Sequence, residues 1–150
     1  MSMYSSIEVS ASGLSAERLA MDVIANNLAN VNTTRTPEGG AFKRQLVVFA
    51  QKQETDPNAS FDPLDDSSDP GKSLDGVQAV GIVNDPSPDR LVYDPTHPDA
   101  DANGYVHMPN IDVVKEMVDM IAASRAYQAN VTAIQESRAI GSAALSLLKA

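Results

Sequence analysis

Four residues near the middle of the chain follow the spacing that opens a calcium-binding loop. The pattern D-x-[DN]-x-[DN]-G is formed by Asp99, Asp101, Asn103 and Gly104. Its second half is missing, because Asn110 stands where the bidentate glutamate belongs. Two prolines just before the pattern also prevent the helix that should precede it. We therefore favour an aspartate-rich turn whose side chains cap their own backbone, with a calcium-binding or other acidic interaction module as the alternative.

Residue types that could carry out catalysis are scarce. His97 and His107 are the only histidines, and the chain has no cysteine. No zinc-protease, nucleophile-elbow, phosphate-loop or dinucleotide-binding motif accompanies them. The aspartates lie in loop-like sequence without the apolar pocket that would raise the pKa of a carboxyl group. We therefore expect neither an enzyme nor a cofactor.

The middle and the ends of the chain differ in the elements that they can form. All nine prolines lie between Thr36 and Asn110. Proline removes an amide donor and clashes inside a helix, so two helix-compatible ends flank a middle that cannot be helical for long. We predict an N-terminal helix in residues 1–33, a β-rich outer insert over 34–109 and a C-terminal helix over 110–150.

Apolar side chains recur at three- and four-residue spacing in both terminal segments, which is typical of helix seams. The N-terminal seam comprises Ile7, Leu14, Met21, Ile24, Leu28 and Val31. The C-terminal seam comprises Val113, Met117, Met120, Tyr127, Val131, Ile134, Leu145 and Leu148. Helices gain stability chiefly by burying such stripes, and the second helix is the longer, so part of its seam needs another chain. The alternative is an intramolecular bundle in which the middle folds back over the exposed seam.

Local signals place the helix ends. A cluster of asparagines before Pro37 ends the first helix near Asn32, because asparagine competes for backbone hydrogen bonds. The second helix begins after Asn110 or Asp112. Gly13 is either a weak spot in the first helix or a point of close approach by another helix.

The insert carries strand-like segments. Apolar residues alternate over 42–50, and shorter candidates occupy 77–83, 91–93 and 104–106. These predict a small antiparallel sheet whose first strand has one better-buried face. The composition of residues 54–74 predicts a mobile acidic loop. The expected fold class is mainly α, with long N- and C-terminal helices packing as a coiled-coil-like pair around a small β-rich, Pro/Asp-rich insert.

Charge limits the partners. The net charge of -9 comes mainly from aspartates in the middle, which disfavours nucleic acid and anionic membrane surfaces. No segment approaches the ~20 apolar residues that span a bilayer, and the start lacks the pattern of a cleaved signal peptide. We expect no direct membrane insertion.

Three stretches together resemble the bacterial flagellar basal-body rod proteins of the proximal rod type. They are residues 10–30, residues 91–110 and residues 112–130. The central stretch is the most discriminating, and it gives the aspartate pattern a structural explanation as a turn that leads into the last helix. The segment 56–72 departs from the family, being longer and more acidic than its usual connection.

The resemblance implies a structural subunit that self-assembles with other flagellar rod subunits and basal-body proteins into the periplasmic drive shaft that transmits torque. It also implies delivery through the flagellar type III export apparatus without a cleaved signal peptide. The two seams would then be the assembly interface. Arg125 would either pair with a carboxylate on the next subunit or, like Tyr127, only cover apolar surface with its stem.

Overall fold

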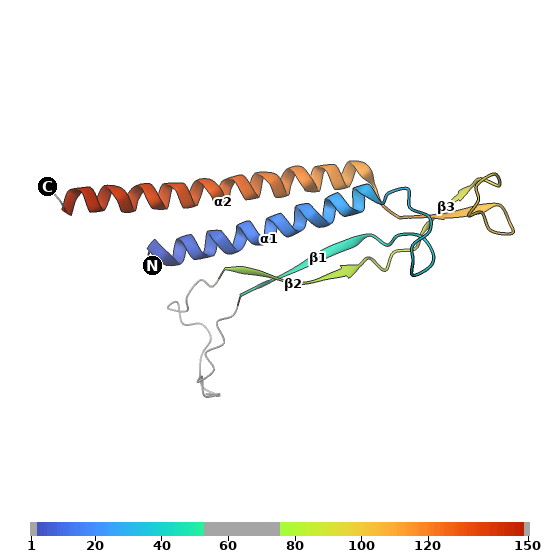
Figure 1. The fold of residues 1–150 in the computed structure, drawn as a ribbon, viewed down its shortest axis with the longest axis horizontal. Helices are drawn as coiled ribbons and strands as arrows, with labels where there is room; N and C mark the ends of the chain where they lie inside the picture. Colours follow the sequence, from blue (N-terminus) through green and yellow to red (C-terminus); the bar gives the residue numbers. More distant parts are fainter. Residues whose placement is uncertain (1–2, 53–75, 149–150) are drawn as a thin grey trace, which may run out of the picture.

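Two long helices dominate the structure, a computed structural model that describes residues 3–52 and 76–148. Helix α1 (Met3–Ala29) and helix α2 (Val113–Leu148) lie side by side and run antiparallel (Figure 1). The strands between them are β1 (Gln45–Gln51), β2 (Val77–Asn84), β3 (Arg90–Tyr93) and β4 (Tyr105–Met108). The terminal helices confirm the mainly α class. The predicted acidic loop at 54–74 lies outside the described residues.

Short polar side chains define where the helices begin and end. The backbone amides of Val114 and Lys115 donate to Asp112 Oδ1, at 2.9 and 3.4 Å, so Asp112 caps the start of α2 as predicted. Helix α1 ends at Ala29, three residues before the predicted end. The cause is the asparagine cluster itself, since Asn30 Nδ2 donates to the Asn26 carbonyl at 2.9 Å and turns the chain there.

The strands pair antiparallel as predicted, but the described strands form two separate hairpins and not one small sheet. Strands β1 and β2 pair antiparallel from Gln45 opposite Asn84 to Gln51 opposite Val77, with an irregularity between Val48 and Phe49. Among the described strands, β3 and β4 pair with each other and with no further strand. Which strands pair depends on how the helices place distant segments in space. The local sequence of a strand does not reveal its partner.

The predicted alternation of burial along the first strand was also wrong. Residues 45–47 are half-buried and residues 48–51 are exposed, so burial falls along the strand. Strand β2 is exposed over all but its first residue. The reason is that, among the described helices and strands, only α1 packs on this two-stranded ribbon.

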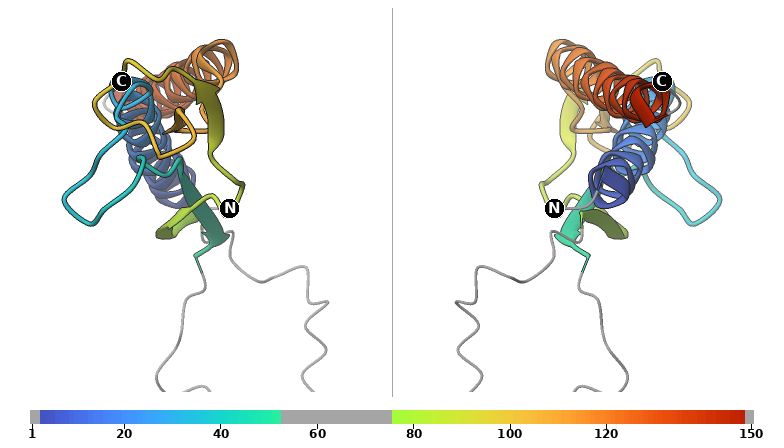
Figure 2. Two further views of the ribbon diagram at one scale, coloured as in Figure 1. Left: turned by 90° about the vertical axis from the view of Figure 1, so that its right-hand side faces the viewer. Right: turned by 90° about the vertical axis from the view of Figure 1, so that its left-hand side faces the viewer.

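The elements are arranged in layers, with α1 between α2 and the β1–β2 hairpin (Figure 1, Figure 2). The described part of the middle therefore does fold back, as the bundle alternative supposed, but its β1–β2 hairpin lies against α1 and not against α2. The β3–β4 hairpin projects past the end of the helix pair where α2 begins (Figure 1). Neither described helix is long and apolar enough to cross a bilayer.

Candidate assembly surface

A buried polar cluster joins the end of α1, the start of β1 and the start of α2. Asn27 and Glu116 are each only 1% exposed. Asn27 Nδ2 donates to Glu116 Oε2 at 3.1 Å and to the Gln45 carbonyl at 2.8 Å, and the Gln45 amide donates back to Asn27 Oδ1 at 2.9 Å. Arg44 Nε donates to Glu116 Oε1 at 2.6 Å. A buried carboxylate is tolerated only when it is paired in this way, so the cluster fixes the relative positions of the three elements.

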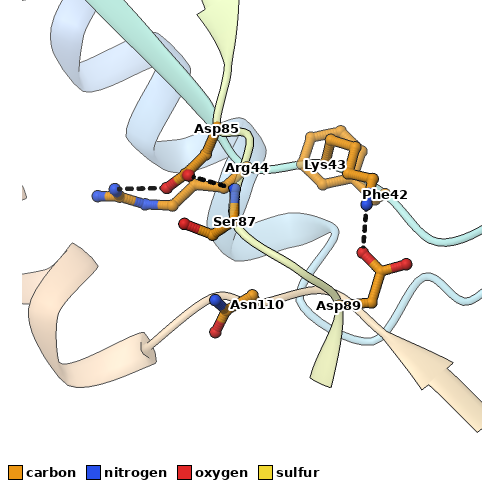
Figure 3. Close-up of a pocket in the computed structure, with 7 residues that line it drawn as sticks. All are labelled: Phe42, Lys43, Arg44, Asp85, Ser87, Asp89 and Asn110. Atoms are coloured by element: carbon orange, nitrogen blue, oxygen red, sulfur yellow. Dashed lines mark hydrogen bonds and ion pairs between the residues drawn. The ribbon is translucent and has the colours of Figure 1, made fainter. Parts of the chain in front are cut away.

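Further ion pairs surround this cluster. Nitrogens of the Arg44 guanidinium lie 3.7 Å from Asp85 and 3.7 Å from Asp119. Lys43, the preceding residue, pairs instead with Asp89 across the hollow drawn in Figure 3. Hydrogen bonds from Ser87, and after them the Arg44 charge, hold the pKa of Asp85 below its ordinary value. A carboxyl kept ionised in this way is a structural partner and not a proton donor at neutral pH.

Farther along the helix pair, the close contact between α1 and α2 depends on a glycine, which has no side chain. A Cβ atom at Gly13 would lie 2.7 Å from Asn130 Nδ2, closer than real contacts allow. The helices therefore approach closely here, which confirms the second interpretation of Gly13. Ala16 and Val23 on α1 and Ala123 on α2 are buried along the same helix pair. Small residues let two helix backbones pack closely.

One face of the helix pair carries an open groove. Its walls are Arg18, Met21, Asp22, Ala25, Met120 and Tyr127, contributed by both helices. A second hollow adjoins it on α2 and is lined by Met120, Ile121, Ser124, Arg125 and Gln128. Both hollows mix apolar walls with charges at their rims. This composition is typical of a surface that meets another protein and not of a small-molecule site.

Beyond the groove, α2 exposes a row of large apolar side chains. Val114, Met117, Val118 and Ile121 are between 52 and 70% exposed and follow helical spacing. At least half of each side chain is therefore left uncovered by the described part of the chain. A contiguous apolar row in water marks an interaction surface.

The aspartate pattern forms the predicted self-capping turn. Asp101 Oδ1 accepts hydrogen bonds from the backbone amides of Asn103 at 2.8 Å and Tyr105 at 2.9 Å. These bonds, that from Tyr105 first, lower the pKa of Asp101. Asp99 Oδ2 accepts from Thr34 Oγ1 at 2.8 Å, which ties the turn to the loop after α1. Two of the carboxylate oxygens that could bind calcium in this pattern therefore already accept hydrogen bonds from the protein.

The structure divides the predicted assembly residues into three groups. Half-buried are Ile7, Leu14, Met21, Ile24, Leu28, Val31, Met120, Tyr127, Val131 and Ile134. Exposed are Val113, Met117, Arg125 and Leu145. The side chain of Leu148 is outside the described ones. Most of the predicted seam is therefore partly covered within the single chain.

Sequence reasoning missed three exposed members of the apolar row, Val114, Val118 and Ile121. They lie beside the predicted seam on the same helix and repeat at three- and four-residue steps. Testing α2 for a second stripe would have found them. The prediction took Asn27 as part of the helix stop and Asn27 and Glu116 as members of the family-like stretches, assigned neither to a buried cluster, and did not name Arg44. Their cluster joins residues as far as 89 positions apart.

Comparisons with known proteins match both terminal segments of the chain. Residues 7–35 match the family model described as flagella basal body rod protein, and residues 102–147 match the C-terminal model of flagellar basal body rod FlgEFG proteins. The flagellar basal-body rod protein FlgC of Borreliella burgdorferi is 46% identical over 99% of both chains. The chain belongs to the FlgC family of flagellar basal-body rod proteins.

Other FlgC proteins extend the similarity. The FlgC of Bacillus subtilis is 41% identical over 99% of this chain and all of its own. That of Salmonella typhimurium is 37% identical over 87% of each chain. As a member of the FlgC family the chain is a structural subunit of the basal-body proximal rod and not an enzyme. The alternative of a calcium module is not favoured.

Proposed function

We propose that the chain builds the proximal rod by packing its terminal helices, residues 1–33 and 110–150, against those of neighbouring subunits. The insert, residues 34–109, faces outward and makes side contacts that help the rod transmit torque. The partners are further copies of this chain and other rod subunits. Family membership and the elongated helix pair support this arrangement.

The exposed apolar row on α2 is the observation that carries the proposal. Burial of apolar surface contributes about 25 cal/mol per Å², and the exposed part of the row contributes nothing of this kind while it faces water. The neighbouring groove adds Met21, Met120 and Tyr127, three of the predicted interface residues. A rod repeats each contact at every subunit, so many moderate interfaces can together make a stiff shaft.

We also propose that the protein reaches the periplasm through the flagellar type III export apparatus and keeps its N-terminus. Membership in a family of basal-body rod proteins supports this route. Amino-terminal sequencing of the subunit recovered from purified basal bodies tests it. A sequence beginning at Met1 or Ser2 is expected, and a start further along the chain would show that a leader had been removed.

A charge placed in the apolar row tests the assembly proposal. Ile121→Asp should leave the folded subunit nearly as stable as before, because Ile121 is 53% exposed. It should strongly reduce incorporation into basal bodies, since burying an unpaired carboxylate in a contact costs several kcal/mol. Quantitative mass spectrometry of purified basal bodies, together with swimming assays, measures the effect.

The matched control is Ala122→Asp. Ala122 is exposed on the same helix and receives the same charge. It is not a member of the row, because it follows Ile121 directly and therefore points to a different side of the helix. It should incorporate nearly normally. Equal incorporation of Ile121→Asp and the unmodified chain would contradict the proposal.

A further inference from the structure

Two exposed stripes on different helices share one spacing. The α2 stripe consists of Val114, Met117, Val118, Ile121, Arg125 and Gln128. The α1 stripe consists of Ala11, Leu14, Ser15, Arg18, Asp22 and Ala25. Every member is exposed except Leu14, which is half-buried. Successive members are separated by the same steps on both helices, so the stripes can be laid against each other in register.

The stripes are complementary in size. The α2 stripe begins with four large apolar side chains, whereas the α1 stripe contains two alanines, a serine and a single leucine beside its two charged residues. In a parallel alignment Val114 meets Ala11 and Val118 meets Ser15. Large side chains then enter the spaces over small ones, which is how two helices pack closely.

Their charges are complementary too. Within the described part of the chain, Arg18, Asp22 and Arg125 make no ion pair. Asp22 and Arg125 occupy the same place in the two stripes. Laying the stripes together in parallel therefore brings an unpaired carboxylate beside an unpaired guanidinium, while the Arg18 stem covers Ile121.

We propose that the α2 stripe of one copy packs parallel against the α1 stripe of a second copy, with Arg125 beside Asp22 of that copy. This rests on the proposed assembly through terminal helices and adds the partner, direction and register. An antiparallel alignment with the same ion pair would place Met117 against Asn30 and Ile121 against Asn26, which is poor apolar packing. The two stripes are different surfaces, so the contact is heterologous and repeats without closing on itself.

Disulfide cross-linking tests the register. The chain has no native cysteine, so only the introduced cysteines of this subunit can form the disulfide. Ser15→Cys and Val118→Cys are expressed as separate copies in cells that lack the unmodified chain, and purified basal bodies containing both are oxidised. These positions do not meet within one copy, where Asn27 lies opposite Glu116 and Gly13 opposite Asn130. A mixed dimer is expected, and each variant alone should give none.

A second pair distinguishes the direction. Ala29→Cys would meet Val118→Cys only in the antiparallel alignment. A dimer from this pair, or no dimer from either pair, would overturn the proposal. A disulfide requires a cysteine on the partner, so the mixed dimer also identifies a second copy as the occupant.

Charge exchange provides an independent measurement. Asp22→Arg and Arg125→Asp should each lower the amount of subunit in basal bodies by about tenfold or more, because like charges then meet in the contact. The chain carrying both changes should recover most of the loss. Failure of the double variant to recover, or normal incorporation of both single variants, would refute this register. If Ile121→Asp still fails to incorporate in that case, assembly through the helices stands and only the register is wrong.

Discussion

Where α1 ends and α2 begins, the fold depends on buried charge, whereas near the other end of α1 it depends on missing side chains. At the first place Asn27, Arg44 and Glu116 satisfy one another in an environment that excludes water. At the second, Gly13 admits Asn130 and Gly76 admits Ser12. The first contact requires partners that neutralise the buried charge of Glu116. The second requires only that the facing side chain fits the space over a glycine. The two ends should therefore fail under different changes.

The largest effect is expected at the charged end. Glu116→Ala should lower the free energy of unfolding by about 3 kcal/mol, because it removes the nearest carboxylate from the half-buried Arg44 and one hydrogen-bond acceptor from the buried Asn27. Asp85 and Asp119 still lie 3.7 Å from Arg44 and keep the loss from being larger. Chemical denaturation followed by circular dichroism measures the change.

Replacing both partners is the matched control. Glu116→Met combined with Arg44→Met should cost much less than Glu116→Ala, since no uncompensated charge remains buried. If the double variant were the less stable of the two, the cluster would be stabilising in its own right and not merely selective.

Next in size is Gly76→Ala, at the uncharged end. Gly76 has a φ of 81°, which costs about 1–2 kcal/mol for a residue with a side chain. The new Cβ would also overlap Ser12 Oγ, which accepts a hydrogen bond from the Val77 amide at 3.1 Å and so anchors the start of β2 to α1. The β1–β2 hairpin should detach while the helix pair remains, visible as faster amide exchange confined to the hairpin.

Combining Gly76→Ala with Ser12→Ala separates the two causes. Ser12→Ala alone is the reference, because it already lacks the hydrogen bond from the Val77 amide. Relative to that reference, the double variant no longer overlaps the hydroxyl but keeps the backbone strain, so about half of the loss should persist. A double variant as stable as Ser12→Ala would show that strain at Gly76 is negligible.

The contacts at these two ends could not be predicted from the sequence equally well. Helix positions were predictable because proline is absent from both ends and Asp112 is a strong cap. Close approach at Gly13 was one of two interpretations, since glycine inside a helix needs a reason. The role of Asn27 was not predictable, because its partners are distant in sequence and asparagine near a helix end already has a local explanation.

The exposed face of α2 was only partly predictable for a similar reason. Apolar residues cover more than half of the circumference of its first turns, so periodicity alone does not say which side meets α1 and which side stays open. That choice is made by Glu116 and Ala123, which are buried against the rest of the chain. A carboxylate is the last residue that a search for a buried seam would select.

A smaller effect is expected where the two helices approach most closely. Gly13→Ala alone should be almost neutral, because the gain of about 1 kcal/mol in helix propensity is offset by displacement of the Asn130 side chain. In a chain that already carries Asn130→Ala, the same change should stabilise the fold by about 1 kcal/mol. A double-mutant cycle in thermal unfolding measures this coupling, and strict additivity would show that the contact carries no energy.

The smallest effect, and the one that separates the two ends most cleanly, is acidification. The pKa of Asp85 in the folded chain lies below its ordinary value of 3.8, chiefly because of hydrogen bonds from Ser87. Its contribution to stability is therefore complete above that ordinary value and is lost as the pH falls through the folded pKa. The Gly13 contact with Asn130 contains no titrating group. Amide exchange at Ser87 should accelerate in this acid range while exchange around Gly13 does not, and Asp85→Asn should abolish the difference. Parallel acceleration at both ends would mean that they unfold as one unit, in which case the contrast between charge and shape would have no consequence for stability.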